Sequence, residues 1–116
     1  MKAHRTLLPE DLLRYGPAKM ARMVASEFGR ASTGCQYRSD VVACYDRARE
    51  LMGVLETVPI DDQTAAYLKP CYKLCVEKEL LREERLAPEF VREFSDRMAE
   101  AFERAAQMLL KGPAHA

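Results

Sequence analysis

Three of the four cysteines stand at positions where their thiols would meet if the chain folds as helices. Cys71 and Cys75 are four residues apart in the stretch YLKPCYKLC. Side chains at this spacing share one face of a helix, so both thiols would reach one metal ion or react as a vicinal pair. Cys44 lies at the centre of the apolar face of another helical segment. If the two segments pack together, three thiols converge, as a site for Cu(I), Zn(II) or oxidant sensing requires.

Core packing is the competing interpretation of the same thiols. Free cysteine is among the most buried residue types and behaves as a small apolar side chain. The spacing differs from that of zinc ribbons, and neither histidine is near a cysteine in the sequence. We therefore take core filling as the first interpretation, with no metal or other cofactor, and a thiolate site of Cys44, Cys71 and Cys75 as the alternative.

Pro70 stands directly before Cys71 in the same segment. A proline inside a helix has no N–H for the carbonyl of Ala66 and costs about 3 kcal/mol unless the helix bends. The sequence predicts a kink or a break at Pro70, with a hinge or an opened carbonyl lining a pocket as the functional alternative.

Catalytic patterns are scarce in this sequence. His4 and His115 lie near the ends of the chain, which disfavours histidine-based di-iron, haem and triad sites. The stretch GRASTG lacks the lysine of a phosphate-binding loop. Glu and Asp are expected on solvent-facing helix surfaces. The exception is Asp40, which would lie in the first turn of a helix that Ser39 caps. The prediction is a protein that is not an enzyme.

Length and charge define the class of protein. The 116 residues suffice for one domain with its own core. Eighteen basic and eighteen acidic residues cancel, and the pI is near 6.7, which disfavours nucleic-acid partners. The chain contains no apolar run of membrane-spanning or secretory length, so we expect a cytoplasmic protein without a membrane partner and with reduced thiols.

Apolar residues recur at helical spacing in four segments. The first starts near Pro9, breaks at Gly16-Pro17, and continues to about Phe28, with Gly29 as its C-terminal glycine. The second covers about residues 37–57 and is the most clearly amphipathic, with Tyr37 on its apolar side.

The third segment runs from Asp61 or Asp62 to about Arg85 and is apolar around most of its circumference. The fourth begins at Pro88 and ends before Gly112. These stripes predict an all-α, antiparallel four-helix bundle that forms a single domain over residues 1–116, frayed at 1–7 and 112–116.

A small neutral bundle of this kind is typical of a non-catalytic interaction module, such as an adaptor, a chaperone or a regulatory subunit. It would bind a protein helix in an apolar groove, or pair with itself as a homodimer. The side chains expected to bind the partner are Tyr67, Leu74, Leu81, Tyr72 and Met23.

Overall fold

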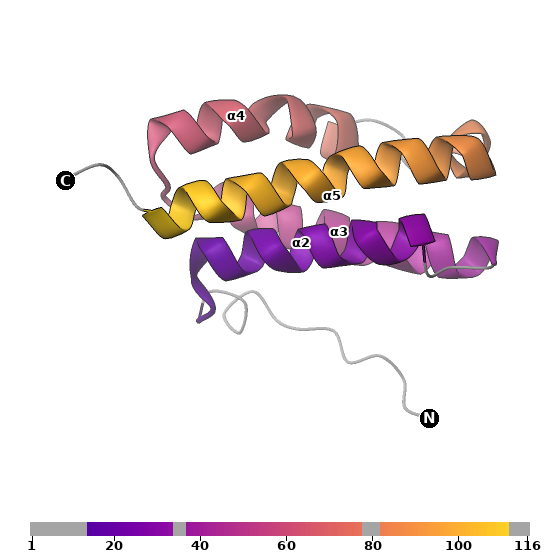
Figure 1. Ribbon diagram of the computed structural model, residues 1–116, viewed down its shortest axis with the longest axis horizontal. Coiled ribbons are helices and arrows are strands. Elements are labelled where there is room, and N and C mark those ends of the chain that lie inside the picture. The colour runs from indigo at the N-terminus through magenta and orange to yellow at the C-terminus, as the bar shows by residue number, and fades with distance from the viewer. Residues whose placement is uncertain (1–13, 34–36, 78–81, 112–116) are drawn as a thin grey trace.

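The computed structural model describes residues 14–33, 37–77 and 82–111, and these form four α-helices without strands. The helices are α2 (Gly16–Thr33), α3 (Arg38–Thr57), α4 (Asp62–Tyr72) and α5 (Pro88–Lys111). Each runs opposite to the one before it, and α5 lies between α4 and α2 (Figure 1). The predicted all-α antiparallel bundle is confirmed. No helix in the described ranges is long and apolar enough to cross a bilayer.

The first helix of the described chain begins where the sequence predicted a break. Gly16 has a φ of +80°, a conformation that glycine adopts without steric cost, and Pro17 follows in the first turn. The predicted start at Pro9 lies outside the described residues. The predicted end at Gly29 is wrong, because α2 continues to Thr33. Burial of Ala31 beyond the glycine offsets much of the cost of about 1 kcal/mol for a glycine inside a helix.

Helix α3 begins close to the predicted position but without the predicted cap. Tyr37 occupies the N-cap position and makes no side-chain capping bond, so the role predicted for Ser39 is wrong. The Tyr37 ring is 67% exposed, although its spacing placed it on the apolar side. The end of α3 follows the prediction, since Val58 is extended before Pro59.

Asp61 caps α4 as predicted, because its carboxylate accepts from the backbone N–H of Thr64 at 2.8 Å. The predicted end of the third helix at about Arg85 is wrong. Pro70 lies inside α4, and the chain passes into a π-helical turn, η1 (Lys73–Glu77), directly after Tyr72. A short 3₁₀ helix, η2 (Glu83–Leu86), then precedes α5, which starts at Pro88 as predicted.

The core lies where α2, α3 and α5 meet. Its centre is an aromatic cluster in which the Phe28 ring lies 6.0 Å from Tyr45 and 6.4 Å from Phe102, between ring centroids. These rings belong to three different helices, and all three side chains are fully buried. Aromatic pairs at such distances add to the stability gained from burial alone, so this cluster anchors the three helices to one another.

Candidate functional site

The three cysteines of the predicted thiol site are all buried. The Cys75 thiol donates to the sulfur of Met98 at 3.6 Å, and Arg47 Nη2 donates to the Cys44 sulfur at 3.7 Å. No three His, Cys, Asp or Glu side chains within residues 14–33, 37–77 and 82–111 are placed to share a metal ion. Burial of the thiols is what the core-filling interpretation predicts, and the metal or redox alternative stays a prediction.

Burial also changes the acid strength of two of these thiols. It raises the pKa of Cys71, and it raises the pKa of Cys75 to about 12, with a smaller contribution from Cys71. Both thiols are therefore protonated near neutral pH. The thiolate is the form that binds metals and attacks oxidants, so neither group is activated for that chemistry.

The four of the five predicted partner-binding side chains that the structure describes do not share one surface. Tyr67 and Leu74 are exposed, at 37% and 44%, on α4 and on the turn after it. Met23 belongs to α2, which lies on the other side of α5 (Figure 1). Tyr72 is buried in the wall of a groove, and Leu81 lies outside the described residues.

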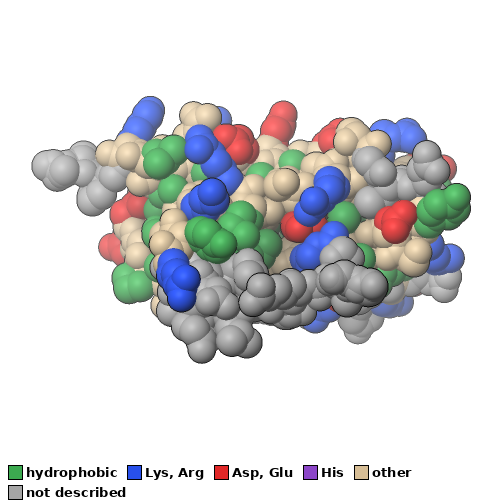
Figure 2. Space-filling model, turned by 90° about the horizontal axis from the view of Figure 1, so that it is seen from below, with side chains coloured by type: hydrophobic (Ala, Val, Ile, Leu, Met, Phe, Trp, Pro, Cys, Tyr) green, Lys and Arg blue, Asp and Glu red, His purple; other side chains and the backbone are tan. Residues whose placement is uncertain are grey.

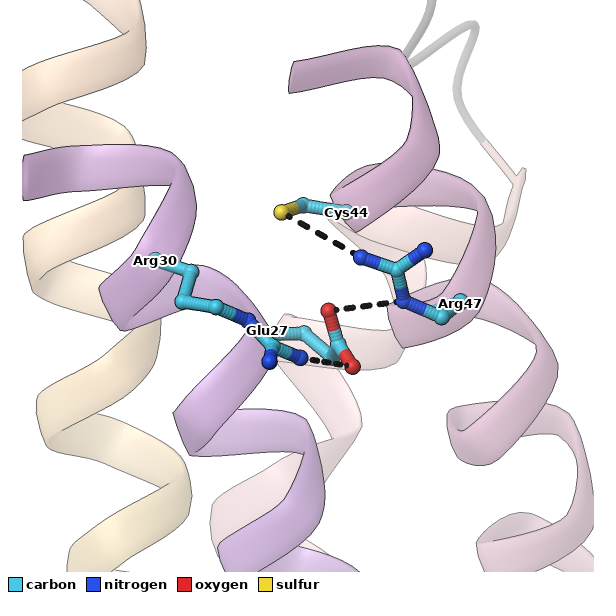
Figure 3. Close-up of polar contacts among 4 residues, drawn as sticks. All are labelled: Glu27, Arg30, Cys44 and Arg47. Atoms are coloured by element: carbon cyan, nitrogen blue, oxygen red, sulfur yellow. Dashed lines mark hydrogen bonds and ion pairs between the residues drawn. The ribbon is translucent and has the colours of Figure 1, made fainter. Parts of the chain in front are cut away.

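One buried carboxylate was missed by the sequence reasoning, which placed acidic residues on solvent-facing surfaces. Glu27 of α2 is only 7% exposed and lies between two arginines (Figure 3). Its carboxylate accepts from Arg47 Nε on α3 at 3.1 Å and pairs with Arg30 on its own helix. The signal was available, because Glu27 stands seven residues after Met20, on the apolar stripe of α2.

This ion-pair cluster is a structural link rather than a binding site. Arg47 of α3 pairs with the Glu27 carboxylate of α2 and so joins the two helices, and Arg47 also reaches the Cys44 sulfur. A carboxylate held by two guanidinium groups has its acceptor oxygens occupied. The Glu27 carboxylate is therefore occupied by its own protein partners.

The groove between α3 and α4 has a different character. Helix α4 packs along α5, whereas α3 meets this segment chiefly through the π-helical turn Lys73–Glu77. The separation leaves a groove of about 570 Å³. Its floor is apolar, and charged side chains stand at its rim. The lining residues are Leu55, Glu56, Val58, Ile60, Ala65, Ala66, Lys69, Tyr72 and Lys73.

Tyr72 is the unusual member of this groove. Its side chain is 8% exposed and its ring lies 6.2 Å from Phe102 of α5, between centroids. Its hydroxyl has no hydrogen-bond partner in the part of the chain that the structure describes. Burial raises the pKa of Tyr72, and the nearby carboxylate of Glu56 raises it further. The hydroxyl is therefore a protonated donor, and no group that the structure describes accepts from it.

Pro70 changes the backbone hydrogen bonding beside the same groove. Because proline has no N–H, the carbonyl of Ala66 lacks its usual helical donor, and Ala66 is one of the residues that line the groove. The sequence suggested an opened carbonyl beside a pocket, and the structure places the pocket next to this residue.

The side of the molecule on which α2 lies carries described charges of both signs. Seen from the α2 and α3 side, basic and acidic side chains are interspersed with apolar ones (Figure 2). A polar groove between α2 and α5 contains Arg22 and Arg97 together with Glu93, Asp96, Glu100 and Glu103. Arg22 and Glu103 are in an ion pair at 3.5 Å.

Comparisons with known proteins add no functional assignment: no protein-family model, curated protein or solved structure matches this chain.

Proposed function

We propose that this protein is a non-catalytic helical interaction module that binds a helix of a partner protein in the groove between α3 and α4. The observation that carries the proposal is the groove itself, which combines an apolar floor with a charged rim. Amphipathic helices bind in grooves of this kind by inserting side chains spaced one helical turn apart.

The two walls of the groove offer small side chains on one side and apolar side chains on the other. Ala65 and Ala66 make the α4 wall low, so a partner helix would approach the backbone closely. On the opposite side, Val58 and Ile60 are half-buried and offer apolar area that a partner would cover. Burying such side chains contributes about 25 cal/mol for each Å² of apolar surface removed from water.

Site-specific photo-cross-linking in the source cell tests this function. A photoreactive amino acid in place of Ala65 lies in the groove, and the same amino acid in place of Arg22 lies on α2 as a matched control. The expected result is a protein adduct from position 65 and none from position 22. An Ile60→Glu substitution, which puts a charge into the groove, should abolish the adduct.

The mass of the adduct separates the possible partners. An adduct of twice the chain mass would identify a homodimer, and a different mass would identify another protein. Equal adducts from both positions, or no adduct from position 65, would contradict the proposal.

A further inference from the structure

The buried hydroxyl of Tyr72 specifies one property of whatever occupies the groove. A buried hydroxyl without a partner destabilises the fold, and Tyr72 has no acceptor among the side chains and backbone groups that the structure describes. The hydroxyl oxygen is itself covered, so the Tyr72 side chain must turn slightly towards the groove before an occupant can supply an acceptor and remove this cost.

The acceptor should be uncharged. Glu56 lies on the opposite wall of the groove, and its negative charge acts on the Tyr72 hydroxyl. A second carboxylate next to Glu56 would be repelled, whereas a hydroxyl or carboxamide oxygen would not. Ser, Thr, Asn and Gln side chains carry such oxygens.

The rim of the groove specifies the charge of the occupant. Lys69 and Lys73 are four residues apart, so they stand one helical turn apart along the α4 side, and both are exposed. Neither lysine forms an ion pair with a carboxylate whose side chain the structure describes. Two positive charges at this spacing are complementary to carboxylates one turn apart on a facing helix.

We propose that the partner segment is an amphipathic helix with acidic side chains along the edge facing Lys69 and Lys73. Its apolar stripe carries one neutral hydrogen-bonding side chain that accepts from the Tyr72 hydroxyl. This inference rests on the proposed function and adds the chemistry of the partner. The lysines select the edge of the helix by charge, and Tyr72 selects its position along the groove.

Three synthetic peptides, each about three helical turns long, test the proposal. The first has leucines at helical spacing, glutamates along one edge, and one serine within the leucine stripe. The second has lysines in place of the glutamates, and the third has alanine in place of the serine. Fluorescence anisotropy with the purified full chain measures the affinity of each.

The wild-type protein should bind the glutamate peptide at least about 10-fold more tightly than the lysine peptide, with a preference that weakens at high salt. A Lys69→Glu/Lys73→Glu variant should reverse this preference. Both side chains are exposed, so the variant keeps the core intact. Equal affinity for the two peptides, or no binding of either, would overturn the proposed partner chemistry.

Tyr72→Phe tests the hydrogen bond separately from the fold. It should weaken binding of the serine peptide about fivefold, as expected for one hydrogen bond, and leave binding of the alanine peptide unchanged. A substitution that merely disturbed the packing would weaken both peptides alike, and that result would overturn the role of the hydroxyl.

The two levels of the proposal fail in different ways. Dodecanoate also has an apolar body and a carboxylate, and binding of dodecanoate but of no peptide would assign the groove to a fatty acid and overturn the inference. A position-65 adduct with a protein helix, together with peptides that do not differ in affinity, would retain the function and reject the acidic partner. Loss of the position-65 adduct would reject both.

Discussion

The hydroxyl of Tyr45 on α3 and the hydroxyl of Ser95 on α5 lie 3.2 Å apart in a hydrogen bond at the centre of the bundle. Both side chains are fully buried, and Ser95 is one of the few polar residues in an otherwise apolar core. A buried polar pair of this kind stabilises the fold only when both members are present, because either one alone remains unsatisfied.

This relationship predicts the outcome of a double-mutant cycle. Tyr45→Phe and Ser95→Ala should each lower the free energy of unfolding by about 1–2 kcal/mol, because each leaves a buried hydroxyl without its partner. The double variant should lose clearly less than the sum of the two. Urea denaturation measures all three, and strictly additive losses would show that the hydrogen bond contributes nothing.

The buried carboxylate of Glu27 predicts a second effect on stability. Glu27→Gln removes the charge that two arginines share, and should cost about 2–3 kcal/mol of unfolding free energy, since it leaves Arg47 half-buried without its counter-ion. The matched control is Glu103→Gln, whose ion pair with Arg22 is exposed on both sides. The control should change stability by less than about 1 kcal/mol. Equal losses in the two variants would remove the special role of Glu27.

The raised pKa of Cys75 predicts how stability changes in alkaline solution. Cys75 has a pKa of about 12 in the fold against an ordinary value of 9.0, so above pH 9 the unfolded chain releases a proton that the folded chain retains. The folded state then binds more protons, and stability must fall as the pH rises from about 9 towards 12. Below pH 9 the stability contributed by the protonated Cys75 thiol is fully present.

Denaturation curves at neutral pH and at several values above pH 9 measure this decline. A Cys75→Ala variant should be less stable at neutral pH because it leaves a cavity, but its stability should decline less steeply with pH. Tyr72 and Tyr45, whose pKa values are also raised by burial, contribute in the same direction and remain in the variant. An unchanged slope in the variant would contradict the assignment to Cys75.

The burial of Cys44, Cys71 and Cys75 predicts slow chemical modification. In a Cys35→Ser background, a thiol reagent should label these residues only as fast as the protein opens, and rapidly once it is denatured. Native mass spectrometry of protein purified without chelator measures how much metal the same protein binds. Fast labelling of the native protein, or a bound metal ion, would favour the thiol-site alternative over core filling.

Local chemistry in the sequence determined where several helices begin and end. Pro88 starts α5, Val58 leaves the helical conformation before Pro59, and Asp61 caps α4, each through groups within a few residues. The apolar stripes likewise determined that the fold is an all-α bundle, because such stripes require burial against other helices. The helix starts, ends and caps depend on contacts between residues that are only a few positions apart in the sequence.

Only the tertiary structure decided which side chains are buried and which form the groove. Tyr72 was predicted as a partner-binding residue, but its burial and its unsatisfied hydroxyl depend on how α4 sits against α5 and apart from α3. Lys69 of α4 and Glu56 of α3 both stand at the rim of the groove. The local sequence pattern does not predict how these two helices lie relative to each other. Local preferences of about 1 kcal/mol or less are smaller than the 1.5–3 kcal/mol gained by burying a large apolar side chain, so packing determines the site.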